Sequence, residues 1–290
     1  MAGASSSRPL SVLETGTALG REGLRVLARV ARHGRVRRDP RRVAGEYDAG
    51  YWSSVLSDRR WERSATLDEF VAPPQTRERI AKIGHRLVRI SDADYYRYRT
   101  DVLRATLTEW APDTTVLAEF GCGYGANLFA LAGQKRWTRL VGFDISAAGL
   151  EAGDQISRRF NLQDVVEFHR LDLLDGADPS FKEARGLTAF TYYCFEQLKH
   201  STEAALRNII ASGVRRVIHI EATPELWKWW RPSDALSRLY AWSQDYQDNL
   251  LSTLRALEAQ GQLRIVHVSR LGYAPGVRHD PTLICWEPPA

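Results

Sequence analysis

A glycine-rich segment near the middle of the chain constrains the fold more than any other feature. Glu119-Phe120-Gly121-Cys122-Gly123-Tyr124-Gly125 follows an apolar run that begins at Thr115 and precedes a stretch with helical apolar spacing up to Arg136. Glycines at such a turn let the backbone bend sharply and approach a ligand closely. The amide groups at the start of the next helix point toward the same place. The segment therefore predicts a ligand site where the first strand of a sheet turns into a helix.

Beyond residue 113 the sequence alternates between strand-like and helix-like stretches. The strand-like runs that precede helical patterns cover residues 115–120, 139–144, 165–171, 187–194 and 214–221. Two further runs, 263–271 and 281–287, are joined by a loop that contains glycine and proline but no helix. This order predicts an α/β fold, with a Rossmann-like, seven-stranded, mostly parallel sheet and helices on both faces. The helix-free final pair predicts one antiparallel C-terminal strand at or near a sheet edge.

The N-terminal arm, residues 1–42, has a different charge from the rest of the chain. It contains ten arginines and three acidic residues, whereas the 290-residue chain has a net charge of +5. Residues 22–33 have the spacing of a short amphipathic helix, which either packs on the main domain or binds an acidic protein partner, an anionic lipid or an RNA backbone. Because the rest of the chain has an excess of acidic residues, we expect no stable nucleic-acid complex on the main body.

Two regions follow the arm. Residues 43–112 are expected to form an N-terminal helical cap or lid, because Ser91 and Asp94 match a capping box at the start of a helix. Residues 113–290 are expected to form the main domain, with an aromatic-rich capping insertion at about 224–248.

The cysteines and the hydropathy pattern indicate the compartment. Cys122, Cys194 and Cys285 are far apart and form no Cys-x-x-Cys pair, so neither a disulfide framework nor a metal site is expected. A reduced, cytoplasmic location is the default for such a chain. No run of 18 apolar residues and no secretory pattern is present, so we expect no transmembrane segment.

Two cofactors compete for the glycine segment. Gly121-x-Gly123-x-x-Ala126 also satisfies the dinucleotide fingerprint, which is weak evidence by itself. Glu119 stands two residues before the first glycine, where a carboxylate would oppose a pyrophosphate but suits a ligand with an ammonium and a sulfonium. The acids Asp144 and Asp172, which follow the next two strands, and the helix-free strand pair also favour S-adenosylmethionine.

With these features, the sequence resembles the class I S-adenosylmethionine-dependent methyltransferase superfamily. The similarity rests on Glu-x-Gly-x-Gly-x-Gly, on Val-Gly-Phe-Asp-Ile-Ser and on the Leu-Asp-Leu-Leu stretch at 171–174, and it covers residues 90–287. It implies that the glycines and Glu119 line the methionine moiety, that Asp144 binds the ribose hydroxyls, and that Asp172 accepts from the adenine amine. The full implied cofactor set is Glu119, Gly121, Cys122, Gly123, Gly125, Asp144, Ile145, Asp172, Leu173 and Tyr193.

Two of these acids have alternative interpretations. Asp144 could instead cap the helix expected over 146–160, and Asp175 is a nearby alternative to Asp172.

Methyl transfer from a sulfonium is a direct displacement with a neutral leaving group, so a base is needed only if the acceptor must lose a proton. The candidate catalytic residues are Glu196 and His200, which follow the fourth strand, and Glu221 at the end of the fifth. We interpret Cys194 as a buried thiol and His219, which alternates with isoleucines, as a core histidine.

Aromatic side chains form two candidate substrate walls. Tyr47, Tyr51 and Trp52 belong to a Tyr-Asp-x-x-Tyr-Trp element that is common among small-molecule methyltransferases. Trp227, Trp230 and Trp242 lie in the expected insertion and suit a planar, apolar or cationic acceptor. The same tryptophans could instead form a hydrophobic subcore or a homodimer interface.

Four functions remain open at this point. The favoured one is O-, N- or C-methylation of a small molecule, in specialised metabolism for example, with S-adenosylhomocysteine as the second product. The others are methylation of a peptide or carrier-bound substrate docked by the arm, an NAD(P)-dependent oxidoreductase, and a noncatalytic S-adenosylmethionine-binding member of the fold.

Overall fold

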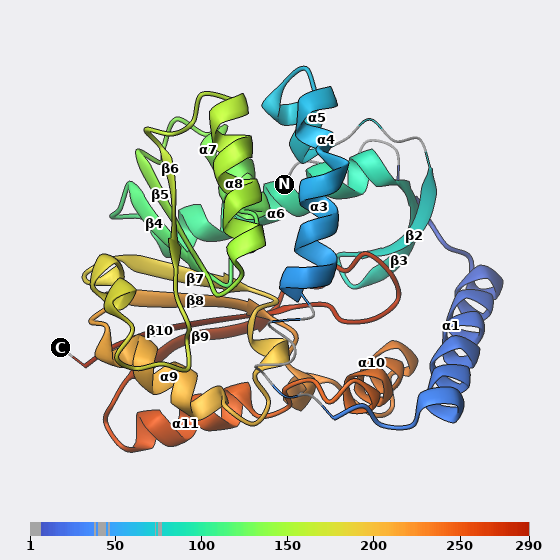
Figure 1. Ribbon diagram of the computed structural model, residues 1–290. Coiled ribbons are helices and arrows are strands. Elements are labelled where there is room, and N and C mark those ends of the chain that lie inside the picture. The colour runs from blue at the N-terminus through green and yellow to red at the C-terminus, as the bar shows by residue number, and fades with distance from the viewer. Residues whose placement is uncertain are drawn as a thin grey trace.

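The computed structural model describes residues 7–37, 39, 45, 47–72, 74 and 77–289, except for the side chains of residues 47 and 51. A large sheet with helices on both faces forms the main body, and helix α1 lies at one side of it, apart from the sheet (Figure 1).

The large sheet has seven strands and one antiparallel member. Its strands are β4 (Val116–Phe120), β5 (Arg139–Asp144), β6 (Val166–Arg170), β7 (Thr188–Tyr192), β8 (Arg216–Glu221), β9 (Arg264–Arg270) and β10 (Thr282–Glu287). Their spatial order is β6-β5-β4-β7-β8-β10-β9 (Figure 1). The pairs from β6 to β8 are parallel, and β10 runs antiparallel to both of its neighbours. The predicted sheet is confirmed, with the antiparallel strand next to edge strand β9.

Side chains alternate between the two faces of this sheet and form a core on each. Leu117 and Leu140 face a core shared with α6 (Asp92–Trp110), α7 (Ala126–Ala132) and α8 (Ala147–Arg159). Ala118 and Val141 face a second core, shared with α9 (Thr202–Ala211), α11 (Leu250–Ala259) and the short η2 (Pro179–Ala184). The strand order reverses between β4 and β7, which is where ligands bind in open parallel sheets.

The region expected to be a helical cap contains a small sheet as well. Its helical segments are η1 (Tyr47–Trp52), α3 (Ser53–Asp58), α4 (Arg60–Arg63) and α5 (Leu67–Val71). A hairpin of β2 (Glu78–Ile83) and β3 (Arg86–Ser91) follows, and β1 (Arg8–Pro9) pairs with β3. The helical description of residues 43–112 is therefore incomplete. The start of α6 is confirmed at Ser91, whose side chain accepts from the amide of Asp94 and donates its hydroxyl proton to the Asp94 carboxylate.

The basic arm contributes a helix longer than predicted. Helix α1 (Val12–His33) begins at a capping box, in which the side chains of Ser11 and Glu14 each accept a hydrogen bond from the other residue's backbone amide. The helix therefore starts ten residues before position 22, where the sequence pattern places its beginning. It packs against α10 (Pro232–Ser243) (Figure 1). The remaining short elements are η3 (Phe195–Gln197) and η4 (Pro224–Leu226).

Candidate active site

The glycine segment turns tightly between β4 and α7. Gly121, Gly123 and Gly125 all have positive φ, at 72°, 55° and 82°, a conformation that side chains disfavour. A Cβ on Gly121 would lie 2.3 Å from the Cys194 sulfur, and one on Gly123 would lie 2.5 Å from the Trp52 ring. The loop therefore has no room for side chains, and Cys194 and Trp52 approach its backbone closely.

Glu119 is buried below this loop with one carboxylate oxygen unsatisfied. Asn127 donates to its Oε1 at 2.6 Å, while Oε2 has no hydrogen-bond partner among the described residues. Arg99 in turn donates to Asn127 and to the Tyr192 hydroxyl. Burial raises the pKa of Glu119 to about 8, although the Asn127 hydrogen bond and the Arg99 charge oppose the shift. A buried carboxyl with a free oxygen is suited to receive a cationic group.

The two acids expected to bind the nucleoside lie at the ends of their strands. Asp144 accepts from the amide of Gly123 at 2.7 Å and from that of Ser146 at 2.9 Å, and so joins the glycine loop to the start of α8. Helix α8 is capped by the Ser146 side chain, which accepts from Gly149. Asp172 accepts from the amide of Leu174 and is half-buried, whereas its alternative Asp175 is exposed.

A cavity of about 710 Å³ lies between α1, α6, α10 and the carboxyl end of β7. Five arginines border it, together with six tyrosines: Tyr95, Tyr96, Tyr192, Tyr193, Tyr240 and Tyr246. Arg99, whose guanidinium interacts with Asn127 beside Glu119, is one of these arginines, so the cavity adjoins the predicted cofactor loop.

The three predicted catalytic residues lie in different surroundings. Glu196 borders the cavity. Glu221 is fully buried behind it, where its carboxylate accepts from the amide of Cys194 at 2.9 Å and burial raises its pKa to about 8. His200 lies away from the cavity lining and pairs with Asp245 at 3.1 Å. Of these three residues, only Glu196 borders the cavity.

The predicted aromatic walls are arranged differently from the expectation. Trp52 covers Gly123 and contacts Tyr124 edge-on, so it belongs to the glycine loop. Trp227 is buried, and Trp230 and Trp242 are exposed, and all three are absent from the cavity lining. The tyrosines near them in sequence line the cavity instead. The side chains of Tyr47 and Tyr51 fall outside the described residues.

Among the remaining cofactor residues, Cys122 and Leu173 are buried, and Ile145 is half-buried directly after Asp144. Tyr193 follows β7 with a positive φ of 53°, borders the cavity and donates its hydroxyl proton to the backbone oxygen of His279.

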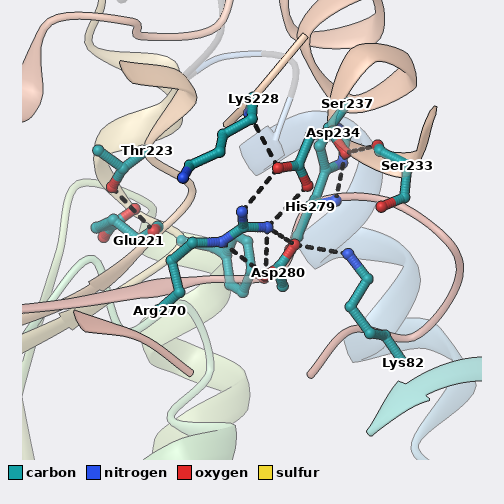
Figure 2. Close-up of polar contacts among 11 residues, drawn as sticks. Lys82, Glu221, Thr223, Lys228, Ser233, Asp234, Ser237, Arg270, His279 and Asp280 are labelled. Carbon is teal, nitrogen blue, oxygen red and sulfur yellow. Dashed lines mark hydrogen bonds and ion pairs between the residues drawn. The ribbon is translucent and has the colours of Figure 1, made fainter. Parts of the chain in front are cut away.

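Sequence reasoning missed His279, which borders the cavity with a positive φ of 58°. Trp227 stacks on its ring, and burial lowers its pKa to about 3, so the imidazole is neutral. An ionic cluster beneath it involves the next residue, Asp280, whose carboxylate accepts from Lys82 and Arg270 at 2.7 Å each (Figure 2). The local sequence gives no signal that a loop histidine between two strands will border a cavity.

Comparison with known proteins identifies the fold. Neither a protein-family model nor a curated protein matches the chain. Similar solved structures include magnesium protoporphyrin IX methyltransferase from Synechocystis PCC 6803 with bound S-adenosylmethionine, at 12% identity and a TM-score of 0.54, covering 88% of this chain and 99% of that one. The same enzyme with bound S-adenosylhomocysteine matches at 13% identity and a TM-score of 0.54, covering 87% and 100%. The pyocyanin biosynthetic protein PhzM matches at 13% identity and 0.51, covering 68% and 56%. The chain therefore has the class I methyltransferase fold.

None of the described helices is both long enough and apolar enough to cross a membrane.

Proposed function

We propose that this protein is an S-adenosylmethionine-dependent methyltransferase that acts on a small molecule. The observation that carries the proposal is the unsatisfied Glu119 Oε2, buried directly below three glycines with positive φ. Its position favours a cofactor with a cationic group, which stabilises the carboxylate form of Glu119, over a dinucleotide, whose pyrophosphate does not. The methyltransferase fold of the chain supports the same choice.

The residues at the loop match the chemical groups of this cofactor, which supplies a methyl group on a sulfonium. Glu119 is assigned to its ammonium and Arg99 to its carboxylate, because the two side chains are linked through Asn127. Asp144 retains lone pairs on both carboxylate oxygens for the ribose hydroxyls, and Asp172 is assigned to the adenine amine.

The acceptor is assigned to the cavity lined by tyrosines and arginines. Tyrosine rings give a planar molecule a large contact area, and they exclude water from the reacting atoms. Glu196 borders the cavity and can receive a proton if the acceptor atom carries one, whereas burial keeps the neighbouring His279 neutral.

Calorimetry tests the cofactor assignment. We expect S-adenosylhomocysteine to bind and NAD to give no heat. Asp144→Asn should weaken binding at least about tenfold, because a charged partner of two hydroxyls is lost. Asp164→Asn, at an exposed position just before β6, is the matched control and should bind like the parent. Binding of NAD without binding of S-adenosylhomocysteine would refute the proposal. Binding of S-adenosylhomocysteine with no methylation of any acceptor in a broad panel would indicate a noncatalytic protein.

A further inference from the structure

Helix α1 has an apolar face that is directed away from the protein. Leu13, Leu24 and Leu27 are 81%, 69% and 57% exposed, and they lie within about 60° of one another at roughly 100° per residue. Ala18 and Val26, on the opposite side of the helix, are buried. The helix therefore packs on the protein through one side and presents leucines to the surroundings on the other.

Exposed tryptophans lie beside the neighbouring helix. Trp229 and Trp230, just before α10, are 65% and 75% exposed, and Trp242 is at the end of that helix. Arg29 of α1 donates to Gln244, directly after α10, at 2.7 Å, which fixes the two helices side by side (Figure 1). Among the described residues, eight large hydrophobic side chains are exposed, and seven of them lie on or beside α1 and α10. We call these seven side chains, with their flanking cations, the α1–α10 surface.

The segment that contains α1 also has a strong positive charge, and the arginines of the helix lie on a different side from its exposed leucines. Residues 7–37 contain seven arginines and two glutamates. Both glutamates are already paired with arginines, Glu14 with Arg8 at 2.6 Å and Glu22 with Arg278 at 2.7 Å. Lys228 adds a cation 5.2 Å from the Trp230 ring centre. Leucines, tryptophans and cations in this combination match helices that lie in the interface of a bilayer.

We propose that the α1–α10 surface binds to an anionic lipid bilayer, with α1 lying in the plane of the interface. Two copies of this chain are a poorer fit, because a two-fold contact would bring the same arginines of both copies together. An acidic protein would satisfy the arginines, but exposed tryptophans beside cations are characteristic of side chains that bridge apolar and aqueous phases. The inference does not depend on the cofactor assignment.

Cosedimentation of the 290-residue chain with vesicles tests this proposal. We expect binding to phosphatidylcholine vesicles with about 30 mol% phosphatidylglycerol, little binding to pure phosphatidylcholine, and weaker binding as salt is raised. Leu24→Glu/Leu27→Glu should lower the partition coefficient at least about tenfold, because two side chains that would insert into the bilayer become charged. Val266→Glu, at an exposed position on edge strand β9, is the matched control and should bind like the parent.

Two further measurements keep the proposal testable if the double variant folds poorly. Lipids brominated on their acyl chains should quench tryptophan fluorescence in the parent, and Trp229→Phe/Trp230→Phe should remove much of that quenching. Gel filtration without lipid should show that Leu24→Glu/Leu27→Glu leaves the oligomeric state unchanged. Failure to bind anionic vesicles, equal loss of binding in Val266→Glu, or dissociation of a dimer by the leucine variant would each overturn the proposal.

Discussion

At the scale of single residues, Glu119 gives the sharpest prediction. Its pKa of about 8 means that the carboxyl is mostly protonated in the free protein at neutral pH. A cation bound beside it favours the carboxylate, so binding should release a proton. The affinity for S-adenosylhomocysteine should therefore rise by up to about tenfold per pH unit below pH 8. Above about pH 8 the affinity should level off. Calorimetry in buffers of different ionisation enthalpy measures both the affinity and the released proton.

Two variants separate this effect from others. Glu119→Gln should bind about 10- to 100-fold more weakly at pH 8 and lose the pH dependence, because a charge-assisted hydrogen bond cannot form. Glu203→Gln on the surface of α9 changes the same side chain at an exposed position and should leave the pH dependence unchanged. Unaltered proton release in Glu119→Gln would show that another group titrates on binding.

At the scale of elements, the short segment η1 closes the glycine loop. Asp48 of η1 accepts from the Ser146 hydroxyl at 2.6 Å and from the amide of Ala148 at 2.9 Å, and so holds η1 against the start of α8. Asp48→Ala should release the segment that carries Trp52 and accelerate amide exchange over 47–52. The binding of S-adenosylhomocysteine should weaken about tenfold, because the lost hydrogen bonds are comparable in energy to one helix-capping interaction.

The matched control for this element is Asp58→Ala at the end of α3. Asp58 pairs with Arg63 at the surface, at 2.6 Å, and forms no hydrogen bond or ion pair with α8 among the described residues. We expect normal exchange over 47–52 and normal binding for this variant. If Asp48→Ala also behaves like the parent, η1 is held by other contacts.

The elements also show where sequence reasoning succeeds and where it ends. The glycine loop and the succession of strands and helices along residues 113–290 could be predicted, because each strand, turn and helix has its own local pattern. The hairpin of β2 and β3 was missed, although Gly84 and His85 at its turn both have positive φ, because charged and apolar residues do not alternate regularly along its strands. His279 and Tyr240 meet at the cavity from separate elements, and no spacing in the sequence reports such a contact.

At the scale of the whole molecule, one buried ionic cluster connects the N-terminal hairpin to the end of the large sheet. Lys82 of β2 is 4% exposed and pairs with Asp280, which also binds Arg270 at the end of β9, and Arg270 reaches Asp234 of α10 (Figure 2). Asp280→Ala would leave the Lys82 ammonium buried without a carboxylate. We expect the free energy of unfolding to fall by about 3–5 kcal/mol, measured in denaturant titrations.

A second substitution identifies the cause of that loss. Lys82→Met in the Asp280→Ala chain removes the unpaired charge and keeps a side chain of similar length, so it should restore part of the stability. Asp113→Ala breaks an exposed pair with Arg215 and should change the unfolding free energy by about 1 kcal/mol or less. If Asp280→Ala costs no more than Asp113→Ala, water must reach Lys82, and the cluster does not hold the hairpin on the sheet. If the cost is as large as expected and Lys82→Met recovers part of it, the loop that contains His279 is held in place by ion pairs from both β2 and β9.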